Sequence, residues 1–339
     1  MKKFGIKVPY LKKIIFIGLV LISSVSCITT YNTMNEILWI DLGSISYGDD
    51  PNQYIEITAP KYNNQNENII FFIKGYGNRM IDPIFLEKYR NEFIIAKIDF
   101  RHITHASIDI GMGGLLSDVH DGILALKNNL ERRGIQPNKV IIIGSSLGGT
   151  LALMYSYTFN EISPIPIAFC VSLAGITDMT DAMFLQHLGW SNNSISRSWL
   201  RNSPTLGITR ISPHDFSRLG FSEYAIEELR RYSPVFYVNE SSPPTIIIHD
   251  TNDKVVPFSN SASLSHILNS YGVPNIFIQS TANAGHLLGN NVINGQRLVF
   301  PPVDARSSGP IRRVTRRIHP LIEEKMISSI NHYISIFCN

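Results

Sequence analysis

Short apolar runs recur along the chain, and longer stretches with helical spacing of apolar residues separate them. Runs in which nearly every residue is apolar are typical of strands buried on both faces of a sheet. An alternating run covers residues 54–58, and the continuous runs cover 69–73, 93–100, 140–143, 167–173, 245–249 and 275–279. The pattern predicts an α/β fold with a mostly parallel central sheet flanked by helices.

Helices are predicted between and after these strands from the spacing of their apolar residues. They cover residues 115–130, 150–157, 260–268 and 322–336, with a further one that ends near residue 91. In a sheet of this kind, ligand and catalytic groups gather at the carboxyl ends of the strands. We therefore expect the chemistry of this chain on the loops that follow its strands.

Residues 178–243 lack this rhythm of strands. Their apolar residues are separated by loop-forming stretches, so we expect a helical insertion that lies above the sheet as a lid or pocket wall. Phe184, Trp190 and Trp199 are candidates for lining the pocket, with the core of the lid as the alternative position for each.

The first 27 residues form a separate unit. Five lysines precede an apolar stretch over residues 14–22, and small residues at 23–26 lead to Cys27. This order is typical of a secretory signal, and the apolar stretch is short for a membrane span. The approach to Cys27 resembles a bacterial lipoprotein processing site, although Ser24 stands where such sites usually carry leucine.

From this segment we expect an exported protein that a lipid on Cys27 anchors to a bacterial membrane. Cleavage and release into the periplasm or the medium, or an uncleaved anchor, are the alternatives. Residues 28–53 would then form a tether or extension, and residues 54–339 would form the folded domain with its insertion at 178–243.

Composition and charge narrow the class of protein. The 339 residues include 44% hydrophobic and 17% charged residues, which is typical of a folded domain with a large core. The net charge of +3 is mild, and the spacing of the one dense basic run downstream favours the solvated side of a helix over a nucleic-acid site. That run contains Arg312, Arg313, Arg316 and Arg317.

No cofactor or metal is expected. Cys170 lies within an apolar run, Cys338 lies next to the last residue, and no zinc-type cysteine spacing occurs. A second group of polar residues lacks recognised ligand spacing and is interpreted as loop and helix-surface side chains. This group contains His102, His105, Asp118, His120 and Asp121.

The strongest chemical signal is the sequence Gly-Ser-Ser-Leu-Gly at residues 144–148, directly after an apolar strand. It places Ser146 on a tight turn between a strand and a helix, where Gly144 and Gly148 have no Cβ to obstruct the bend. Such a turn exposes a hydroxyl beside backbone N–H groups, which is the geometry of an acyl-transfer nucleophile. A glycine-rich turn without chemistry is the alternative.

A serine nucleophile needs a base and an orienting carboxylate. Asp253, four residues beyond the predicted strand 245–249, is the chosen acid. Asp250 is a second candidate for the acid, with a turn residue that tolerates a left-handed conformation as its alternative role. Asp178, after the strand 167–173, is a third candidate.

His286 is the chosen base because it follows the last predicted strand and small residues precede it. The order serine, aspartate, histidine along the chain is the one that this kind of fold requires. His249 and His266 are alternatives, but one ends a strand and the other falls in a predicted helix, which favours structural roles.

The backbone N–H of Leu147, directly after Ser146, is expected to form one half of an oxyanion hole. The loop after the strand 69–73 would supply the second donor, with Tyr76 as the first candidate and Gly77 as the next. An ordinary glycine turn is the alternative interpretation of that loop.

Together these motifs resemble the α/β-hydrolase superfamily over roughly residues 54–290. The closest resemblance is to its serine esterase/lipase branch, with feruloyl-esterase-like and prolyl-oligopeptidase-like catalytic domains. The segments that carry the resemblance are 98–101, Asp118, 144–149, 173–178, 233–235, 243–257 and Gly285-His286.

The chain departs from this family at two positions. Lys74-Gly75-Tyr76-Gly77 replaces the His-Gly-Gly motif common in related esterases, and Asp250 stands where a glycine usually follows the histidine of the acid-bearing loop. The first departure bears on the oxyanion hole and the acyl pocket, and neither removes a residue of the expected triad.

The resemblance implies a serine hydrolase that cleaves carboxylic esters through Ser146, His286 and Asp253 and an acyl-enzyme intermediate. A prolyl-oligopeptidase-like peptidase is the second hypothesis, although the segment before residue 54 is too short for the propeller that usually accompanies such domains. A surface binding lipoprotein that keeps the fold without turnover is a hypothesis of another class.

Overall fold

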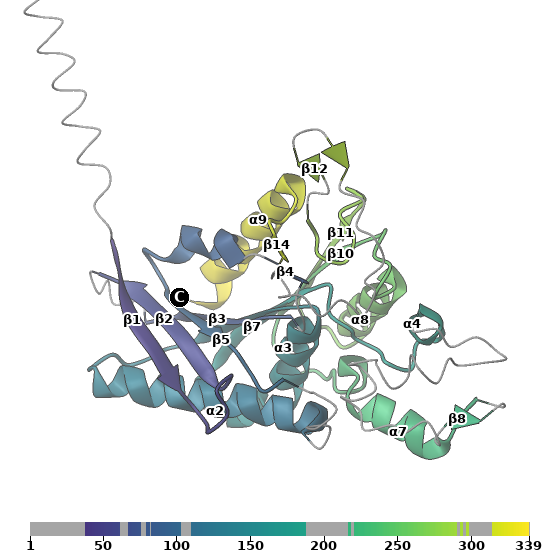
Figure 1. Ribbon diagram of the computed structural model, residues 1–339, viewed down its shortest axis with the longest axis horizontal. Coiled ribbons are helices and arrows are strands. Elements are labelled where there is room, and N and C mark those ends of the chain that lie inside the picture. The colour runs from purple at the N-terminus through teal and green to yellow at the C-terminus, as the bar shows by residue number, and fades with distance from the viewer. Residues whose placement is uncertain are drawn as a thin grey trace, which may run out of the picture.

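An eight-stranded sheet organises the part of the chain that the computed structural model describes (Figure 1). The described residues are 38–61, 67–75, 79–81, 83–102, 110–187, 216–217, 220–289, 292–293, 296–297 and 314–338. In spatial order the strands are β1 (Trp39–Ser46), β2 (Tyr54–Pro60), β5 (Ile94–Ile98), β3 (Ile69–Ile73), β6 (Val140–Ser145), β7 (Ile167–Leu173), β10 (Thr245–Asp250) and β11 (Asn275–Ser280).

The sheet is parallel from β5 to β11 and antiparallel at one edge. β1 pairs with β2, and β2 with β5, in antiparallel fashion, whereas every pairing from β5 onward is parallel. The carboxyl ends of β6, β7, β10 and β11 therefore lie side by side at one edge of the sheet. The loops after three of these strands carry Ser146, Asp253 and His286.

Two core layers explain why the central strands are apolar at every position. In β3, Ile69, Phe71 and Ile73 pack in the layer that includes helices α2 (Gly111–Arg132), α3 (Leu147–Thr158) and α8 (Phe258–Ser270). The alternate residues Ile70 and Phe72 pack in the other layer, with the 3-10 helix η2 (Pro83–Tyr89) and helix α9 (Pro320–Phe337). Figure 1 shows α2 and α9 on opposite sides of the sheet.

Helix α2 is formed by the pattern that predicted it. Its buried residues recur with a spacing of three or four along one side, which matches the helical period. They include Leu115, Val119, Ile123, Leu126 and Leu130. The helix ends before Gly134, whose positive φ of 79° and N–H bond to the carbonyl of Glu131 turn the chain toward β6.

The predicted α/β-hydrolase fold is confirmed, with strands β3 and β7 at their predicted bounds. Two local differences appear. Strand β1 falls within residues 28–53, where we expected a tether, and the stretch expected to be a helix ending near residue 91 is the 3-10 helix η2. β1 was missed because its pattern of half-buried and exposed positions gives no continuous apolar run.

The region between β7 and β10 contributes no strand to the central sheet in its described residues. It contains α4 (Ala182–His187), the short hairpin β8 (Phe216–Ser217) and β9 (Gly220–Phe221), α7 (Glu223–Arg231) and the 3-10 helix η5 (Pro234–Phe236). Phe184 is buried in the core layer of α3. Trp190 and Trp199 lie outside the described residues.

The C-terminal region returns to the edge of the sheet where the strands end. β14 (Val314–Arg316) pairs in parallel with β4 (Arg79–Ile81), and Ile318 forms an isolated bridge with Gly289. The arginine run was expected on a helix. That expectation is wrong for Arg316, which lies in β14, because this segment finds hydrogen-bond partners in β4.

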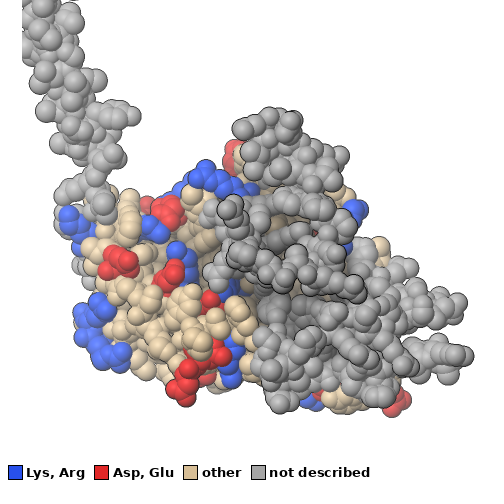
Figure 2. Space-filling view, viewed as in Figure 1, with Lys and Arg blue, Asp and Glu red and all other residues tan. Residues whose placement is uncertain are grey.

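Lysine, arginine and acidic side chains are interspersed over the described surface that Figure 2 displays. A further small sheet pairs β12 (Val292–Ile293) with β13 (Gln296–Arg297). Within the described residues, no helix has the length and apolar character needed to cross a membrane.

Candidate active site

Ser146 occupies a strained turn between β6 and α3. Its backbone has φ of 53° and ψ of −122°, a region that residues with a side chain rarely adopt. The turn is held on both sides, because the Ser146 N–H donates to the Leu173 carbonyl at 2.8 Å and the Ser146 carbonyl accepts from the Thr150 N–H at 3.0 Å. A strained, over-determined conformation of this kind is typical of functional positions.

Close backbone packing explains the glycines on either side of Ser146. A Cβ on Gly144 would collide with the backbone of Gly148, and a Cβ on Gly148 would collide with the carbonyls of Ile73 and Lys74. Gly75 also runs against the turn, since a Cβ there would lie 3.4 Å from the Cβ of Ser146. The loop after β3 is thus in contact with the serine.

Three side chains from three different loops meet at this edge. The Ser146 Oγ lies 2.8 Å from Nε2 of His286, and Nδ1 of His286 lies 2.8 Å from Oδ2 of Asp253. The side chain of Asp253 is fully buried, while that of His286 is 15% exposed. The structure therefore brings together the three residues that the sequence singled out.

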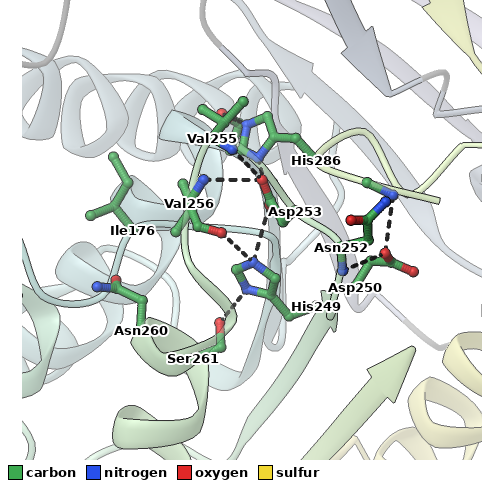
Figure 3. A network of polar contacts seen from close by, with 12 residues as sticks. Ile176, His249, Asp250, Asn252, Asp253, Val255, Val256, Asn260, Ser261 and His286 are labelled. Atoms are coloured by element: carbon green, nitrogen blue, oxygen red, sulfur yellow. Dashed lines mark hydrogen bonds and ion pairs between the residues drawn. The ribbon is translucent and has the colours of Figure 1, made fainter. Parts of the chain in front are cut away.

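Asp253 is held by several donors at once (Figure 3). Its Oδ1 accepts from the N–H groups of Val255 at 2.7 Å and Val256 at 3.0 Å, and its Oδ2 also lies 3.1 Å from Nε2 of His249. Burial alone would raise the pKa of this carboxyl, but the hydrogen bonds from His249 and His286 hold the pKa well below its usual range. Asp253 is therefore a fixed negative charge beside His286.

His249 is a buried partner of the acid rather than of the serine. Its Nε2 also lies 3.0 Å from the carbonyl of Val256, and its Nδ1 lies 2.7 Å from the Oγ of Ser261. Because the carbonyl and the ionised Asp253 can only accept, Nε2 must carry a hydrogen. In the neutral ring, the Ser261 hydroxyl then donates to Nδ1, and every polar atom of the imidazole has a partner.

The other candidate acids and bases lie elsewhere. The carboxylate of Asp178 accepts from the N–H and the hydroxyl of Thr180, at 2.7 and 2.6 Å. His266 is exposed on α8. Asp250 is fully buried, and its carboxylate bonds the backbone of the loop that carries His286, at the N–H groups of Ala284 and Gly285.

The expected oxyanion hole is described only in part. Leu147 is the first residue of α3, directly after the serine, so its N–H has no acceptor within the helix. Tyr76 and Gly77 lie outside the described residues. The strand end before them is anchored, because Lys74 forms an ion pair with Asp99 after β5.

The histidines considered as a metal cluster have other surroundings where they are described. His102 lies 3.5 Å from Asp99, and Nδ1 of His120 lies 3.1 Å from the Tyr155 hydroxyl. Across the described ranges, no three histidine, cysteine, aspartate or glutamate side chains are grouped to hold a metal ion. His105 and Cys27 lie outside those ranges, and Cys170 and Cys338 are buried free thiols.

Sequence reasoning assigned His249 a structural role and interpreted Asp250 as a turn residue or a rival acid. The structure shows that His249 bonds the Asp253 carboxylate and that Asp250 bonds the loop that carries His286. The signal that was available is a pair of polar residues at the end of an otherwise apolar strand, where each must find a buried partner.

A family comparison agrees with this geometry. Residues 55–268, more than half of the chain, match the family model described as BD-FAE. The chain belongs to the BD-FAE family. The match spans Ser146 and Asp253 and ends before His286, so the contact between His286 and Ser146 is known from the structure and not from the family model.

Relatives of this BD-FAE protein carry hydrolase names. It is 23% identical over 248 residues to "Probable isoprenylcysteine alpha-carbonyl methylesterase ICMEL1" of Arabidopsis thaliana, covering 68% of this chain and 47% of the relative. It is 26% identical over 161 residues to the "Acylamino-acid-releasing enzyme" of the same organism, covering 46% of this chain and 18% of that enzyme. The BD-FAE protein therefore spans about half the length of the first relative and less of the second.

A solved structure extends the likeness of fold to nearly the whole BD-FAE chain. Esterase B from "Lactobacillus Rhamnosis (HN001)" aligns with a TM-score of 0.57 at 11% identity, covering 96% of this chain and 95% of that one. At this identity the match supports the α/β-hydrolase fold and nothing finer.

Proposed function

We propose that this protein hydrolyses carboxylic esters, with Ser146 as the nucleophile. The observation that carries the proposal is the 2.8 Å contact between the Ser146 Oγ and Nε2 of His286. A serine hydroxyl becomes a useful nucleophile when a base within hydrogen-bond reach accepts its proton. The strained turn supports the same role because it presents the hydroxyl at the sheet edge.

The fixed charge on Asp253 determines which nitrogen of His286 acts as base. An ionised carboxylate can only accept, so Nδ1 of His286 carries the hydrogen that it shares with Oδ2 of Asp253. Nε2 then has a free electron pair that faces the Ser146 hydroxyl. As the imidazole gains the proton of Ser146, the negative charge of Asp253 stabilises the imidazolium.

Acyl transfer then follows in two steps. The Ser146 oxygen attacks the ester carbonyl, and the tetrahedral oxyanion takes hydrogen bonds from the Leu147 N–H and, as second donor, the N–H of Tyr76. His286 returns its proton to the leaving alcohol, and the acyl-serine ester remains. A water molecule then gives a proton to His286 and attacks this ester, and His286 passes the proton to the Ser146 oxygen as it leaves. The carboxylic acid and the free serine result.

The ester bond is proposed over the peptide bond on the basis of the family match and the methylesterase named among the relatives. The acylamino-acid-releasing relative keeps the peptidase as the second candidate, although it matches the chain over a shorter stretch. A binding protein without turnover would have no physical need for a buried aspartate, an imidazole and a serine hydroxyl in one hydrogen-bonded series.

The test is covalent labelling combined with a substrate series. A fluorophosphonate probe should modify Ser146 in the wild type, identified by peptide mass spectrometry, and should not modify Ser146→Ala. The folded wild type should hydrolyse p-nitrophenyl esters of graded chain length faster than aminoacyl-p-nitroanilides. Faster cleavage of the anilides would favour the peptidase, and absence of both labelling and turnover in folded protein would favour the binding protein.

We also propose that the protein is exported and that a lipid on Cys27 anchors it to the membrane. The support is the lysine-rich and apolar order of the first 27 residues. In a bacterial host, metabolic labelling with a fatty acid should mark the wild type in the membrane fraction and not Cys27→Ser. Unlabelled protein in the medium or periplasm would instead indicate cleavage and release.

A further inference from the structure

Asp250 is a buried carboxylate with four hydrogen-bond donors. It is the last residue of β10 and has no exposed surface. Its Oδ1 accepts from the N–H groups of Asn252 at 3.0 Å and Gly285 at 3.2 Å. Its Oδ2 accepts from the Ser280 hydroxyl at 2.7 Å and the Ala284 N–H at 3.1 Å. A buried carboxylate is costly unless such donors surround it.

Three of the four donors belong to the segment that carries His286. Ala284 and Gly285 directly precede His286, and Ser280 ends the strand from which this loop departs. The loop is irregular, with positive φ at Asn283 and Gly285. Because such backbone has no strand ladder to join, its N–H groups need other acceptors, and Asp250 provides two.

Asp250 also holds the acid through its main chain. The Asp253 N–H donates to the Asp250 carbonyl at 3.0 Å. One residue thus fixes the start of the turn that carries Asp253 and, through its side chain, the loop that carries His286 (Figure 3). The 2.8 Å contact between these two side chains depends on the relative position of the two loops.

We propose that Asp250 is a positioning residue, which holds His286 in register with Asp253 and Ser146 by binding the N–H groups of Ala284 and Gly285. The proposal rests on the proposed function for its kinetic consequence. It requires no contact between Asp250 and substrate. Loss of the carboxylate therefore lowers kcat and leaves KM nearly unchanged.

The principal variant is Asp250→Asn, which keeps the shape but directs an NH2 group at donors that need an acceptor. Displacement of a catalytic group by about 1 Å costs up to about 100-fold in rate, so we expect kcat for p-nitrophenyl acetate to fall about 10- to 100-fold. The amide protons of Ala284 and Gly285 should also exchange faster with solvent. Far-downfield proton NMR should show a weakened signal for the His286 Nδ1–H.

A matched control is Asp50→Asn, at the turn between β1 and β2. Asp50 also accepts from the N–H of the asparagine two residues later, at 2.8 Å, but it lies beside the antiparallel edge of the sheet. It should keep the wild-type kcat, KM and amide exchange. An equal loss of kcat in both variants, or an Asp250→Asn enzyme whose kcat matches the wild type, would overturn the proposal.

Ser280→Ala is the second variant, in case Asp250→Asn does not fold. It removes one hydroxyl donor and leaves the carboxylate and its backbone donors in place, so a smaller fall in kcat at constant KM is expected. Unchanged kcat together with unchanged exchange at Ala284 and Gly285 would overturn the proposal. The exchange and NMR measurements need no turnover, so they remain informative even if the wild type fails to hydrolyse esters.

Discussion

Ser146 lies on a turn shaped by close backbone packing, whereas Asp253 and His286 lie on loops held by buried hydrogen bonds. Around Ser146, glycines allow two strands and a helix to approach until no Cβ would fit. Around Asp253 and His286, buried polar side chains lie between the loops. His249 bonds the Asp253 carboxylate, and Asp250 accepts from the backbone of the loop that carries His286. The turn at Ser146 thus depends on glycines that lack a Cβ, whereas the other two loops depend on particular hydrogen-bonding side chains.

This difference decides how each region responds to substitution. When a Cβ is added to a turn that has no room for it, the surrounding backbone must shift, so the main effect is a loss of folding stability. A loop held by hydrogen bonds retains its course when one bond is lost, but the chemical groups that it carries shift. We therefore expect substitutions near Ser146 to change stability and those near His286 to change turnover.

The largest effect expected on the hydrogen-bonded side comes from Asp253→Asn. The amide cannot stabilise an imidazolium, and its NH2 group favours the wrong tautomer of His286, so kcat should fall about 10⁴-fold. Steady-state hydrolysis of p-nitrophenyl acetate measures it. Asp178→Asn tests the rival acid in parallel, and a greater loss there than in Asp253→Asn would contradict the assignment.

The corresponding change on the packed side is Gly148→Ala. Its Cβ would press on the carbonyls of Ile73 and Lys74, which are backbone atoms and cannot rotate away. Overpacking of this kind should lower the free energy of unfolding by about 2–3 kcal/mol, as urea titration measures. The kinetic constants of the fraction that remains folded are a second readout.

Gly113→Ala is the control for the packed side. Gly113 lies in α2, where an added Cβ would meet, among the described residues, only the Tyr232 hydroxyl, at 3.7 Å. Alanine stabilises a helix relative to glycine by about 0.5–1 kcal/mol, so this variant should be at least as stable as the wild type. If both variants lost the same stability, close packing at the turn would not be the cause.

A smaller effect on turnover is expected when Asp253 loses its second imidazole partner. His249→Leu removes a donor to Asp253, and it leaves the Val256 carbonyl without a donor and the Ser261 hydroxyl without its acceptor. We expect kcat to fall about tenfold at constant KM, with a loss of stability of about 1–3 kcal/mol. His249→Gln keeps a donor and should recover part of kcat, whereas equal kcat in the two variants would show that only packing matters.

The same contrast explains what the sequence could predict. The apolar runs of β3 and β7 and the glycines around Ser146 are local signals, because each follows from residues within a few positions. The partners of His249 and Asp250 were not predictable in this way. Asp250 faces Ser280 only because β10 and β11 pair in one particular register, and a single sequence does not state that register.

Strand β1 and the pairing of β14 with β4 were missed for a related reason. β1 has half-buried and exposed positions without regular alternation, and its pairing with β2 shifts register between Asp41 and Gly43. β14 and β4 come from segments far apart in the chain, so their pairing depends on the complete fold. Local sequence patterns therefore predicted the main strands and the candidate site residues, whereas the contacts between distant segments depend on the complete fold.

The smallest effect expected is an acid-dependent loss of stability that Asp253 causes. Its folded-state pKa is held below the unfolded value of about 3.9, so the ionised carboxylate stabilises the folded protein at neutral pH. This contribution is lost as the pH falls from about 4 toward the folded value. Relative to Asp253→Asn, the wild type should therefore lose up to about 1.4 kcal/mol of unfolding free energy per pH unit in that range.

Urea titrations of the wild type and Asp253→Asn from neutral pH to about pH 3 measure the difference directly. His249 and His286 face residue 253, so Asp253→Asn keeps the same two imidazole neighbours and removes the negative charge. The difference should narrow below about pH 4, where the Asp253 carboxyl of the folded wild type begins to lose its charge advantage. A difference that stayed constant down to pH 3 would mean that hydrogen bonding alone, and not the charge of Asp253, stabilises the acid–base side of the site.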